Sequence, residues 1–259
     1  MVPYKNLRSF ATLRRIIARL RGPRGCPWDR KQTSESLKTS FLEEAYEVLH
    51  AIDRQDAGEL RDELGDLMLH IVLQSQIASE AGRFSIEDVI ERISAKLIHR
   101  HPHVFGDAGA KSVDEIVANW EVLKREERPE GRSLLDSVPA ELPALAQSES
   151  VQRRVAGVGF DWPEVSGIIE KLGEEVAELR RAPDEREKAK EFGDLLFTLV
   201  NLARRSGIDA EAALRGANQR FSSRFRYMEG LCRSRGLDIS KLTLDDQNSL
   251  WEEAKKSAA

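Results

Sequence analysis

The chain has 259 residues, of which 41% are hydrophobic, so it is long enough to bury a substantial core and to form two domains of ordinary size. Its net charge is −4 and Lys and Arg form no long block, which excludes the basic surface typical of nucleic-acid binding. Two widely separated cysteines, a basic N-terminal stretch and apolar runs well short of the ~20 residues of a membrane span argue against a disulfide scaffold, a signal peptide and a membrane protein. We therefore expect a cytoplasmic protein with no nucleic-acid or membrane partner.

Apolar residues recur at helical spacing along the first half of the chain, and they predict helices over residues 8–20, 34–52, 57–80, 85–100 and 112–127. Ser85 with Asp88, and Ser112 with Glu115, have the spacing of helix-start motifs. The segment 21–33 and the HPHVFGD segment at 101–107 contain Gly and Pro and are predicted to be loops.

The second half has the same helical pattern after a segment with three prolines and a glycine, which predicts a linker at 129–143. Helices are predicted over 144–155, 164–206, 209–235 and 244–256, the second being a hairpin that turns at Pro183 and Asp184. No segment alternates as a strand does. The fold class is therefore all-α, with one helical bundle at 1–128 and a second at 144–259.

Two pairs of acids lie within the stretch from Phe41 to Asp66. Each pair has a spacing of three, which puts both carboxylates on one helix face, and fifteen residues separate the pairs: Glu44 and Glu47, then Glu63 and Asp66. If the two helices fold back on each other, four carboxylates converge, and a hard cation would relieve their repulsion. Roughly seven such pairs arise by chance in so acidic a chain, so a single pair is equally consistent with a solvated helix face.

The repetition of the arrangement favours a metal site. The second half contains the same spacing, with twelve residues between its pairs: Glu175 and Glu178, then Glu191 and Asp194. The flanking sequences also match, including Gly65 and Gly193, which predict a close helix contact beside the carboxylates because glycine inside a helix costs about 1 kcal/mol. Oxygen ligands of this kind suit Mg²⁺, which is commonly shared with substrate phosphates.

Three further features occur in both halves. These are a Trp/Asp loop, a pair of cations four residues apart, and a tryptophan with a lysine four residues later: CPWD at 26–29 and GFDW at 159–162; Lys96 with Arg100 and Arg220 with Arg224; Trp120 with Lys124 and Trp251 with Lys255. Cations can meet phosphate oxygens and an aromatic ring can stack on a base, so the set predicts a nucleotide polyphosphate site. Each feature alone is more often a surface or packing residue, and His99, His101 and His103, which have no counterpart in the second half, are predicted to be structural.

These motifs, with RHPHVFGD, NWE-x-x-K and AN-x-x-F-x-x-RF, resemble the MazG family of nucleoside triphosphate pyrophosphohydrolases in its two-domain form, from about Leu7 to Lys256. The resemblance implies two tandem MazG-like domains, a homodimer, and Mg²⁺-dependent hydrolysis of NTPs or dNTPs to the monophosphate and pyrophosphate, with a role in clearing nucleotide pools. It implies two sets of residues in the second half: metal ligands Glu175, Glu178, Glu191 and Asp194 with Glu174 beside them, and nucleotide contacts Lys171, Arg220, Arg224, Trp251 and Lys255.

The chain departs from the family pattern at three positions. Arg220 stands where lysine is common, Lys190 stands where a second acid is often found, and Ser40 occupies the position that corresponds to Lys171. The first half therefore lacks one phosphate-binding cation, and we expect the second half to be the main site, with the first half retained as a second one.

The predicted reaction is attack of an activated water on the α-phosphorus, with Glu174 and Glu175 as candidate general bases. Two alternatives stay open at this point. One is a related all-α pyrophosphatase dedicated to a single nucleotide such as dUTP or phosphoribosyl-ATP, and the other is a helical interaction protein that binds Mg²⁺ only for stability.

Overall fold

A computed structural model of the chain describes residues 6–107, 109, 112–127 and 131–257. These residues form helices, turns and loops with no strand among them, which confirms the predicted all-α class. The chain divides into two compact units, Met1–Lys124 and Arg125–Ala259. None of the described helices is long and apolar enough to cross a bilayer.

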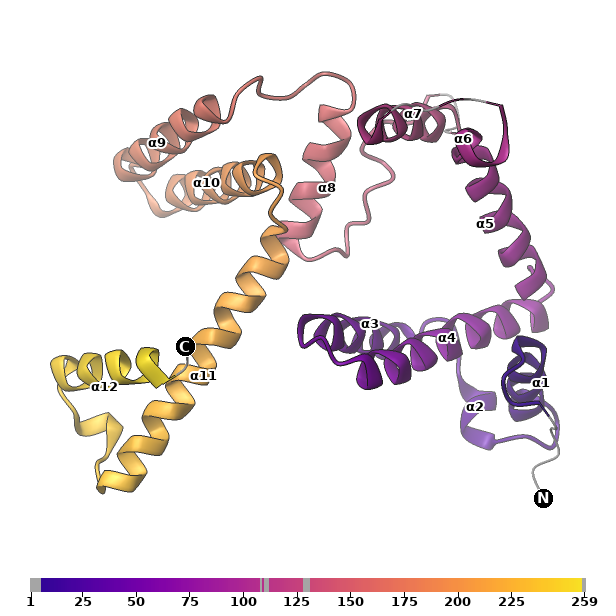
Figure 1. Ribbon diagram of the computed structural model, residues 1–259, viewed down its shortest axis with the longest axis horizontal. Helices are drawn as coiled ribbons and strands as arrows, with labels where there is room; N and C mark the ends of the chain where they lie inside the picture. Colours follow the sequence, from indigo (N-terminus) through magenta and orange to yellow (C-terminus); the bar gives the residue numbers. More distant parts are fainter. Residues whose placement is uncertain (1–5, 108, 110–111, 128–130, 258–259) are drawn as a thin grey trace. The chain divides into compact units, whose positions relative to one another are not determined.

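Unit 1 is built around an antiparallel pair of helices, α3 and α4, which lie side by side (Figure 1). Its helices are α1 (Phe10–Arg21), α2 (Pro27–Lys31), α3 (Lys38–Asp53), α4 (Ala57–Glu80), α5 (Ile86–Arg100), α6 (Pro102–Phe105) and α7 (Val113–Glu126). A buried cluster joins α1 to the second half of α4 and includes Ile17, Leu37 and Val72. The core of unit 1 therefore lies along the second half of α4, whereas the acids lie in its first half.

Unit 2 repeats this pairing with α9 and α10, and α8 packs on α10. Its helices are α8 (Ala144–Ala156), α9 (Val165–Arg181), α10 (Glu185–Arg205), α11 (Ala210–Arg235) and α12 (Leu244–Ser257), with a short 3₁₀ helix at Ile239–Lys241. A separate core joins the end of α11 to α12 through Met228, Cys232, Leu250 and Ala254. Figure 1 shows α12 beside the far end of α11, away from the α9–α10 hairpin.

Aspartate caps start the second helix of each hairpin. The side chain of Asp56 accepts hydrogen bonds from the backbone N–H groups of Gly58 and Glu59, and Asp184 caps α10 in the same way. These bonds satisfy N–H groups that have no partner within the helix, so each acidic hairpin turns at a residue whose type selects a helix start. The predicted capping box at Ser85 and Asp88 is confirmed.

Two segments predicted as loops contain short helices, α2 in 21–33 and α6 in 101–107, so those predictions were too coarse. In each helix a proline stands at the first position, Pro27 or Pro102, where its missing N–H costs nothing. The helix predicted from residue 34 begins instead at Lys38, because Thr33 and Ser36 exchange side-chain to backbone hydrogen bonds that close a turn.

The predicted close contact at the repeated glycines is wrong within the chain. A Cβ added at Gly65 or Gly193 would meet nothing within 4 Å among the described atoms. Gly65 instead lines a shallow hollow with Leu64 and Met68 on the open face of α4. Both glycines therefore lie on helix surfaces that the chain itself leaves uncovered.

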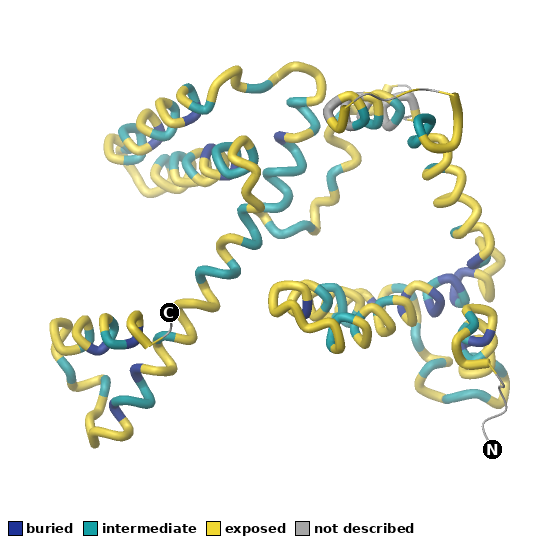
Figure 2. The backbone as a smooth tube through the Cα atoms, viewed as in Figure 1, coloured by how far each residue is buried: buried dark blue, intermediate teal, exposed yellow. Residues whose placement is uncertain are grey.

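Apolar side chains remain exposed along both hairpins, and Figure 2 shows much of their surface as exposed or intermediate. Examples are Leu64 (47% exposed) and Met68 on α4, and Phe192 (52% exposed) and Leu196 on α10. The chain exposes 18466 Å² in total, whereas two separate globular domains of half its mass would together expose roughly 14,000 Å². The chain therefore leaves more surface open than two compact domains would, and exposed apolar side chains on both hairpins are typical of a surface that associates with another protein.

Candidate active site

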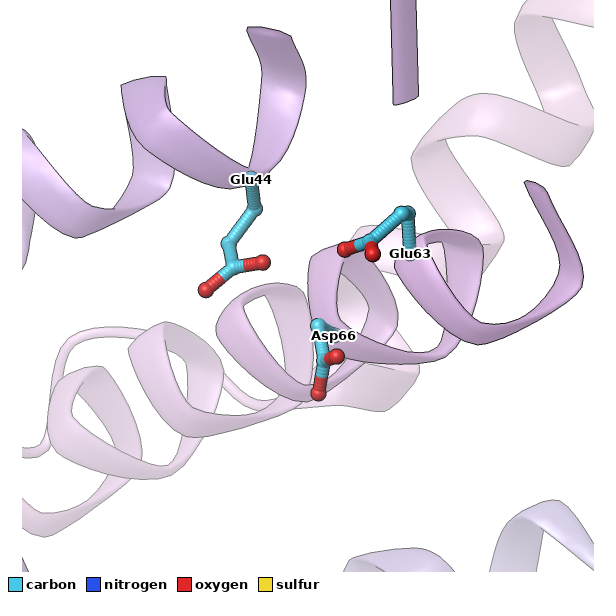
Figure 3. A group of neighbouring side chains, drawn as sticks. All are labelled: Glu44, Glu63 and Asp66. Carbon is cyan, nitrogen blue, oxygen red and sulfur yellow. The ribbon is translucent and has the colours of Figure 1, made fainter. Parts of the chain in front are cut away.

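Three of the four predicted acids of unit 1 meet between α3 and α4. Glu44 points from α3 toward Glu63 and Asp66 on α4 (Figure 3), and each offers a carboxylate oxygen within 4.8 Å of the others. Helical spacing places Glu63 and Asp66 on one face of α4, and the antiparallel packing of α3 brings Glu44 to that face. The convergence predicted from the sequence is present for these three acids, and Glu47 interacts with Glu44 and Glu63 through its charge and side-chain hydrogen bonds.

The carboxylates of unit 1 repel one another. The pKa of Glu44 is raised, first by its partial desolvation and then by the charges of Asp66 and Glu47. The pKa of Glu63 is also raised, first by desolvation and then by the charge of Glu47 and a hydrogen bond with it. Both shifts follow first from partial burial and then from the gathering of acids without a compensating cation.

These shifts predict how the stability of unit 1 depends on pH in the absence of metal. The folded state binds protons at Glu44 and Glu63 more tightly than the unfolded chain does, so the free energy of unfolding should rise as the pH falls from neutral toward their ordinary value of 4.5. Groups with a lowered pKa, such as Asp56, act only at lower pH. Thermal unfolding in EDTA should therefore show a midpoint that rises between pH 7.5 and pH 5.5. Glu44→Gln should flatten this slope, and a midpoint that falls equally in both proteins would contradict the prediction.

His70 faces the unit 1 cluster, although it belongs to none of the sequence motifs described above. It lies one turn after Asp66 on α4, is 6% exposed, and its Nε2 lies 4.0 Å from Glu44 Oε1. Its Nδ1 is buried without a hydrogen-bond partner among the described residues, and its ring packs edge-on against Phe41. The spacing of four from Asp66 was the signal that could have found it, because it places both side chains on the same face of α4.

Unit 2 also gathers three acids between its paired helices. Glu175 and Glu178 on α9 and Glu191 on α10 each offer an oxygen within 4.8 Å of the others. Asp194 is exposed on the next turn of α10 and is not in this group. Glu175 is 4% exposed, and its Oε2 is buried without a hydrogen-bond partner in the described part of the chain. A buried carboxylate oxygen left unpaired is costly unless a cation binds it.

Two lysines lie on the unit 2 carboxylates. Lys171 Nζ lies 2.9 Å from Glu175 Oε1 and 3.1 Å from Glu174 Oε1, and Lys190 Nζ lies 2.8 Å from Glu191 Oε1. Hydrogen bonding to these carboxylates raises the pKa of both lysines. Lys171 and Glu174, predicted from the sequence, are therefore at the cluster, but the lysine contacts the acids themselves.

The remaining predicted nucleotide contacts lie together on α11 and α12. The Arg224 guanidinium is 5.9 Å from the centre of the Trp251 ring, and that ring also packs against Phe221 at 5.0 Å. Lys255, one turn after Trp251, pairs with Glu252 at 2.6 Å, and Arg220 lies one turn before Arg224. Because α12 lies away from the α9–α10 hairpin, these residues form a second group rather than one site with the carboxylates of the same chain.

Unit 1 contains the same cation and aromatic pair. The Arg100 guanidinium lies 5.8 Å from the centre of the Trp120 ring, which matches the geometry of Arg224 and Trp251. The side chain of Lys124, predicted to accompany Trp120, lies outside the described residues. His101 Nδ1 lies 2.6 Å from the carbonyl oxygen of Leu97, a local contact at the end of α5.

A cavity of about 480 Å³ lies between α8, the GFDW segment and α10. Its lining is mainly apolar and includes Phe160, Trp162 and Phe197. Phe197 follows Asp194 by three residues on α10. Arg204 donates to Asp161 at 2.5 Å, so the pKa of Asp161 is lowered although burial alone would raise it. The ion pair fixes the segment that carries the two aromatic rings, and the size and apolar lining of the cavity suit a planar apolar group.

Each cluster has the donor set that a hard divalent cation requires. Three carboxylate oxygens close enough to share one ion, one of them buried without a partner in unit 2, fit a cation with oxygen ligands. Acids on paired helices, with cations and an aromatic surface elsewhere in the unit, can bind a polyphosphate through a shared ion.

Comparisons with known proteins match both halves. The sequence profile of the MazG nucleotide pyrophosphohydrolase domain matches residues 32–105, and that of phosphoribosyl-ATP pyrophosphohydrolase matches residues 157–221. The chain is 44% identical to the nucleoside triphosphate pyrophosphohydrolase/pyrophosphatase MazG of Thermotoga maritima over 95% of each chain. It is 43% identical to the nucleoside triphosphate pyrophosphohydrolase of Escherichia coli K12, over 93% of this chain and 95% of that protein. An uncharacterized protein of Bacillus subtilis is 46% identical over 96% of this chain and 52% of its own length.

The fold, the paired acidic hairpins and these matches define an all-α pyrophosphohydrolase, a hydrolase. The chain belongs to the MazG family.

Proposed function

We propose that the chain hydrolyses nucleoside triphosphates, ribo- or deoxyribo-, to the monophosphate and pyrophosphate, with Mg²⁺ held mainly by unit 2. The observation that carries the proposal is the buried oxygen of Glu175, which lies without a partner among three acids. Two relatives alike over nearly the whole chain are named nucleoside triphosphate pyrophosphohydrolases, which favours this substrate class over phosphoribosyl-ATP alone.

In the proposed mechanism, Glu175, Glu178 and Glu191 would hold the cation, with Asp194 on the next turn of α10. When bound there, the cation would supply positive charge that offsets the charge of the triphosphate. Glu174 lies beside the cluster without belonging to it, so its carboxylate is the group that takes the proton of the attacking water. Water then attacks the α-phosphorus, and pyrophosphate leaves.

Cations complete the proposed site. Lys171 is already at the carboxylates, and Arg220 and Arg224 supply guanidinium groups that can hold the leaving phosphates. Trp251 offers a ring face to the base, and Lys255 lies one turn from it. Because this second group lies apart from the carboxylates in one chain, a second copy of the chain would have to bring it to them.

A homodimer therefore forms part of the proposal. The exposed apolar faces of α4 and α10, which include the two uncovered glycines, support association between copies of these hairpins. The cytoplasmic location, the clearing of nucleotide pools and activity of unit 1 stay predictions.

Product analysis tests the proposed function. The full chain is incubated with a panel of NTPs, dNTPs, dUTP and phosphoribosyl-ATP in the presence of Mg²⁺, and the products are separated. We expect monophosphate and pyrophosphate in equal amounts from several nucleotides, and none in EDTA. A diphosphate with free phosphate would contradict attack at the α-phosphorus, turnover of phosphoribosyl-ATP alone would favour the specialised enzyme, and metal-dependent melting without product would favour a binding protein.

A further inference from the structure

We propose that the two acidic clusters take up a divalent cation in different ways because Lys171 serves as a resident counter-ion in unit 2. A cation entering unit 2 must displace this ammonium group from Glu175, and a polyphosphate promotes the exchange because its oxygens can receive the ammonium group. In unit 1 no lysine occupies the corresponding place, and the cation binds alone. The inference rests on the metal sites of the proposed function.

The geometry of unit 2 indicates that Lys171 is a counter-ion of the carboxylates, and not a cation left free to bind phosphate. Lys171 Nζ bridges Glu174 and Glu175 at 3.1 Å and 2.9 Å, and reaches the one acid of the cluster that is 4% exposed. Lys190 neutralises Glu191 on the opposite helix. The second oxygen of Glu175 is buried without a hydrogen-bond partner among the described atoms. Two ammonium groups therefore compensate part of the negative charge before any metal arrives.

The corresponding positions of unit 1 contain no cation. Ser40 takes the place of Lys171, and its hydroxyl donates to the carbonyl of Leu37 at 3.3 Å. Asp62 takes the place of Lys190 and pairs with Arg61, away from the cluster. Within the described ranges, no Lys or Arg forms an ion pair with Glu44, Glu63 or Asp66, and Glu44 has only His70 nearby, at 4.0 Å. The raised pKa values of Glu44 and Glu63 agree with this lack of compensation.

The different charges of the two clusters predict different conditions for cation binding. In unit 1 a divalent cation relieves repulsion at once, so metal alone should bind. In unit 2 two ammonium groups already pair with cluster acids, and a cation that binds alone must displace Lys171 from Glu175 and leave it paired only with Glu174. Phosphate oxygens offer Lys171 a new anionic partner, so metal and polyphosphate should each increase the affinity of unit 2 for the other.

A reciprocal exchange tests this inference on the full chain: Lys171→Ser and Ser40→Lys, with Lys188→Ser as the control. Lys188 lies on α10 and pairs with Glu185, not with the cluster. Mn²⁺, a Mg²⁺ substitute with an EPR signal, is titrated without nucleotide and again with tripolyphosphate, which has no base. Circular dichroism checks that each variant remains helical.

We expect the unaltered chain and the Lys188→Ser control to bind one Mn²⁺ per chain tightly on its own, and a second weakly unless tripolyphosphate is present. In the absence of tripolyphosphate, Lys171→Ser should increase the affinity of unit 2 for Mn²⁺ at least about tenfold, and Ser40→Lys should lower the affinity of unit 1 by a similar factor. Two equal ions bound without tripolyphosphate, or titrations that both exchanges leave unchanged, would overturn the inference and leave the proposed function standing. Absence of Mn²⁺ binding under all conditions would overturn both.

Discussion

Glu175→Gln is expected to lower kcat/KM for nucleoside triphosphate hydrolysis at least about a hundredfold, without unfolding the protein. Glutamine has the shape of glutamate, but its amide removes one negative charge and one strong oxygen ligand from the centre of the unit 2 cluster. The loss should come from the missing charge and not from a packing defect, because glutamine fits the same buried position on α9. Initial rates at several Mg²⁺ concentrations measure the effect, and a higher Mg²⁺ requirement for the residual activity would identify the lost ligand.

Two matched variants locate the activity within the chain. Glu185→Gln removes an exposed carboxylate from the start of α10, at 89% exposure of its side chain, and should leave turnover unchanged. Glu44→Gln makes in unit 1 the same change that Glu175→Gln makes in unit 2, and we expect it to retain most of the activity. If Glu44→Gln abolished turnover and Glu175→Gln did not, the assignment of unit 2 as the main site would be wrong.

The sequence predicted the carboxylate clusters because repetition distinguishes a site from chance. Glu44 with Glu63, and Glu175 with Glu191, belong to different helices, yet helix periodicity and a short turn are enough to place them together. Aspartates at the turns define where each second helix starts. These are local rules, and they were sufficient for the fold class, for most helices and for three acids in each cluster.

The details that the sequence missed depend on contacts that spacing does not contain. Spacing assigns Asp194 to the same face as Glu191, but not which carboxylates come within reach of one ion. It marks Lys171 as a cation near the acids without revealing that the side chain already binds them. The repeated glycines predict a close helix contact beside the carboxylates, whereas both lie on faces that the described chain leaves uncovered, because a sequence indicates a close approach without naming the partner.

Mixed dimers can show whether the predicted nucleotide contacts on α11 and α12 act on the carboxylates of their own chain or on those of a second copy. Arg224 and Trp251 lie on helices that extend away from the carboxylates of their own unit, so we infer that each catalytic site combines α9 and α10 of one copy with α11 and α12 of another. Glu175→Gln and Arg224→Ala should each be nearly inactive as purified proteins. When the two are co-expressed and paired at random, half of the dimers are mixed, and in each mixed dimer one site has both changes and the other has neither.

Random pairing should therefore restore about a quarter of the unaltered turnover per site. Co-expression of Glu175→Gln with Glu191→Gln provides the control, since both changes affect the same helix pair and no mixed dimer regains an intact carboxylate cluster. The dependence on pairing can be checked by following recovered activity against the fraction of mixed dimer, separated by distinct affinity tags. If activity stays absent in the first mixture although mixed dimers form, each chain must bring Arg224 to its own carboxylates. Unit 2 would then have to rearrange α11 against the α9–α10 hairpin when a triphosphate binds.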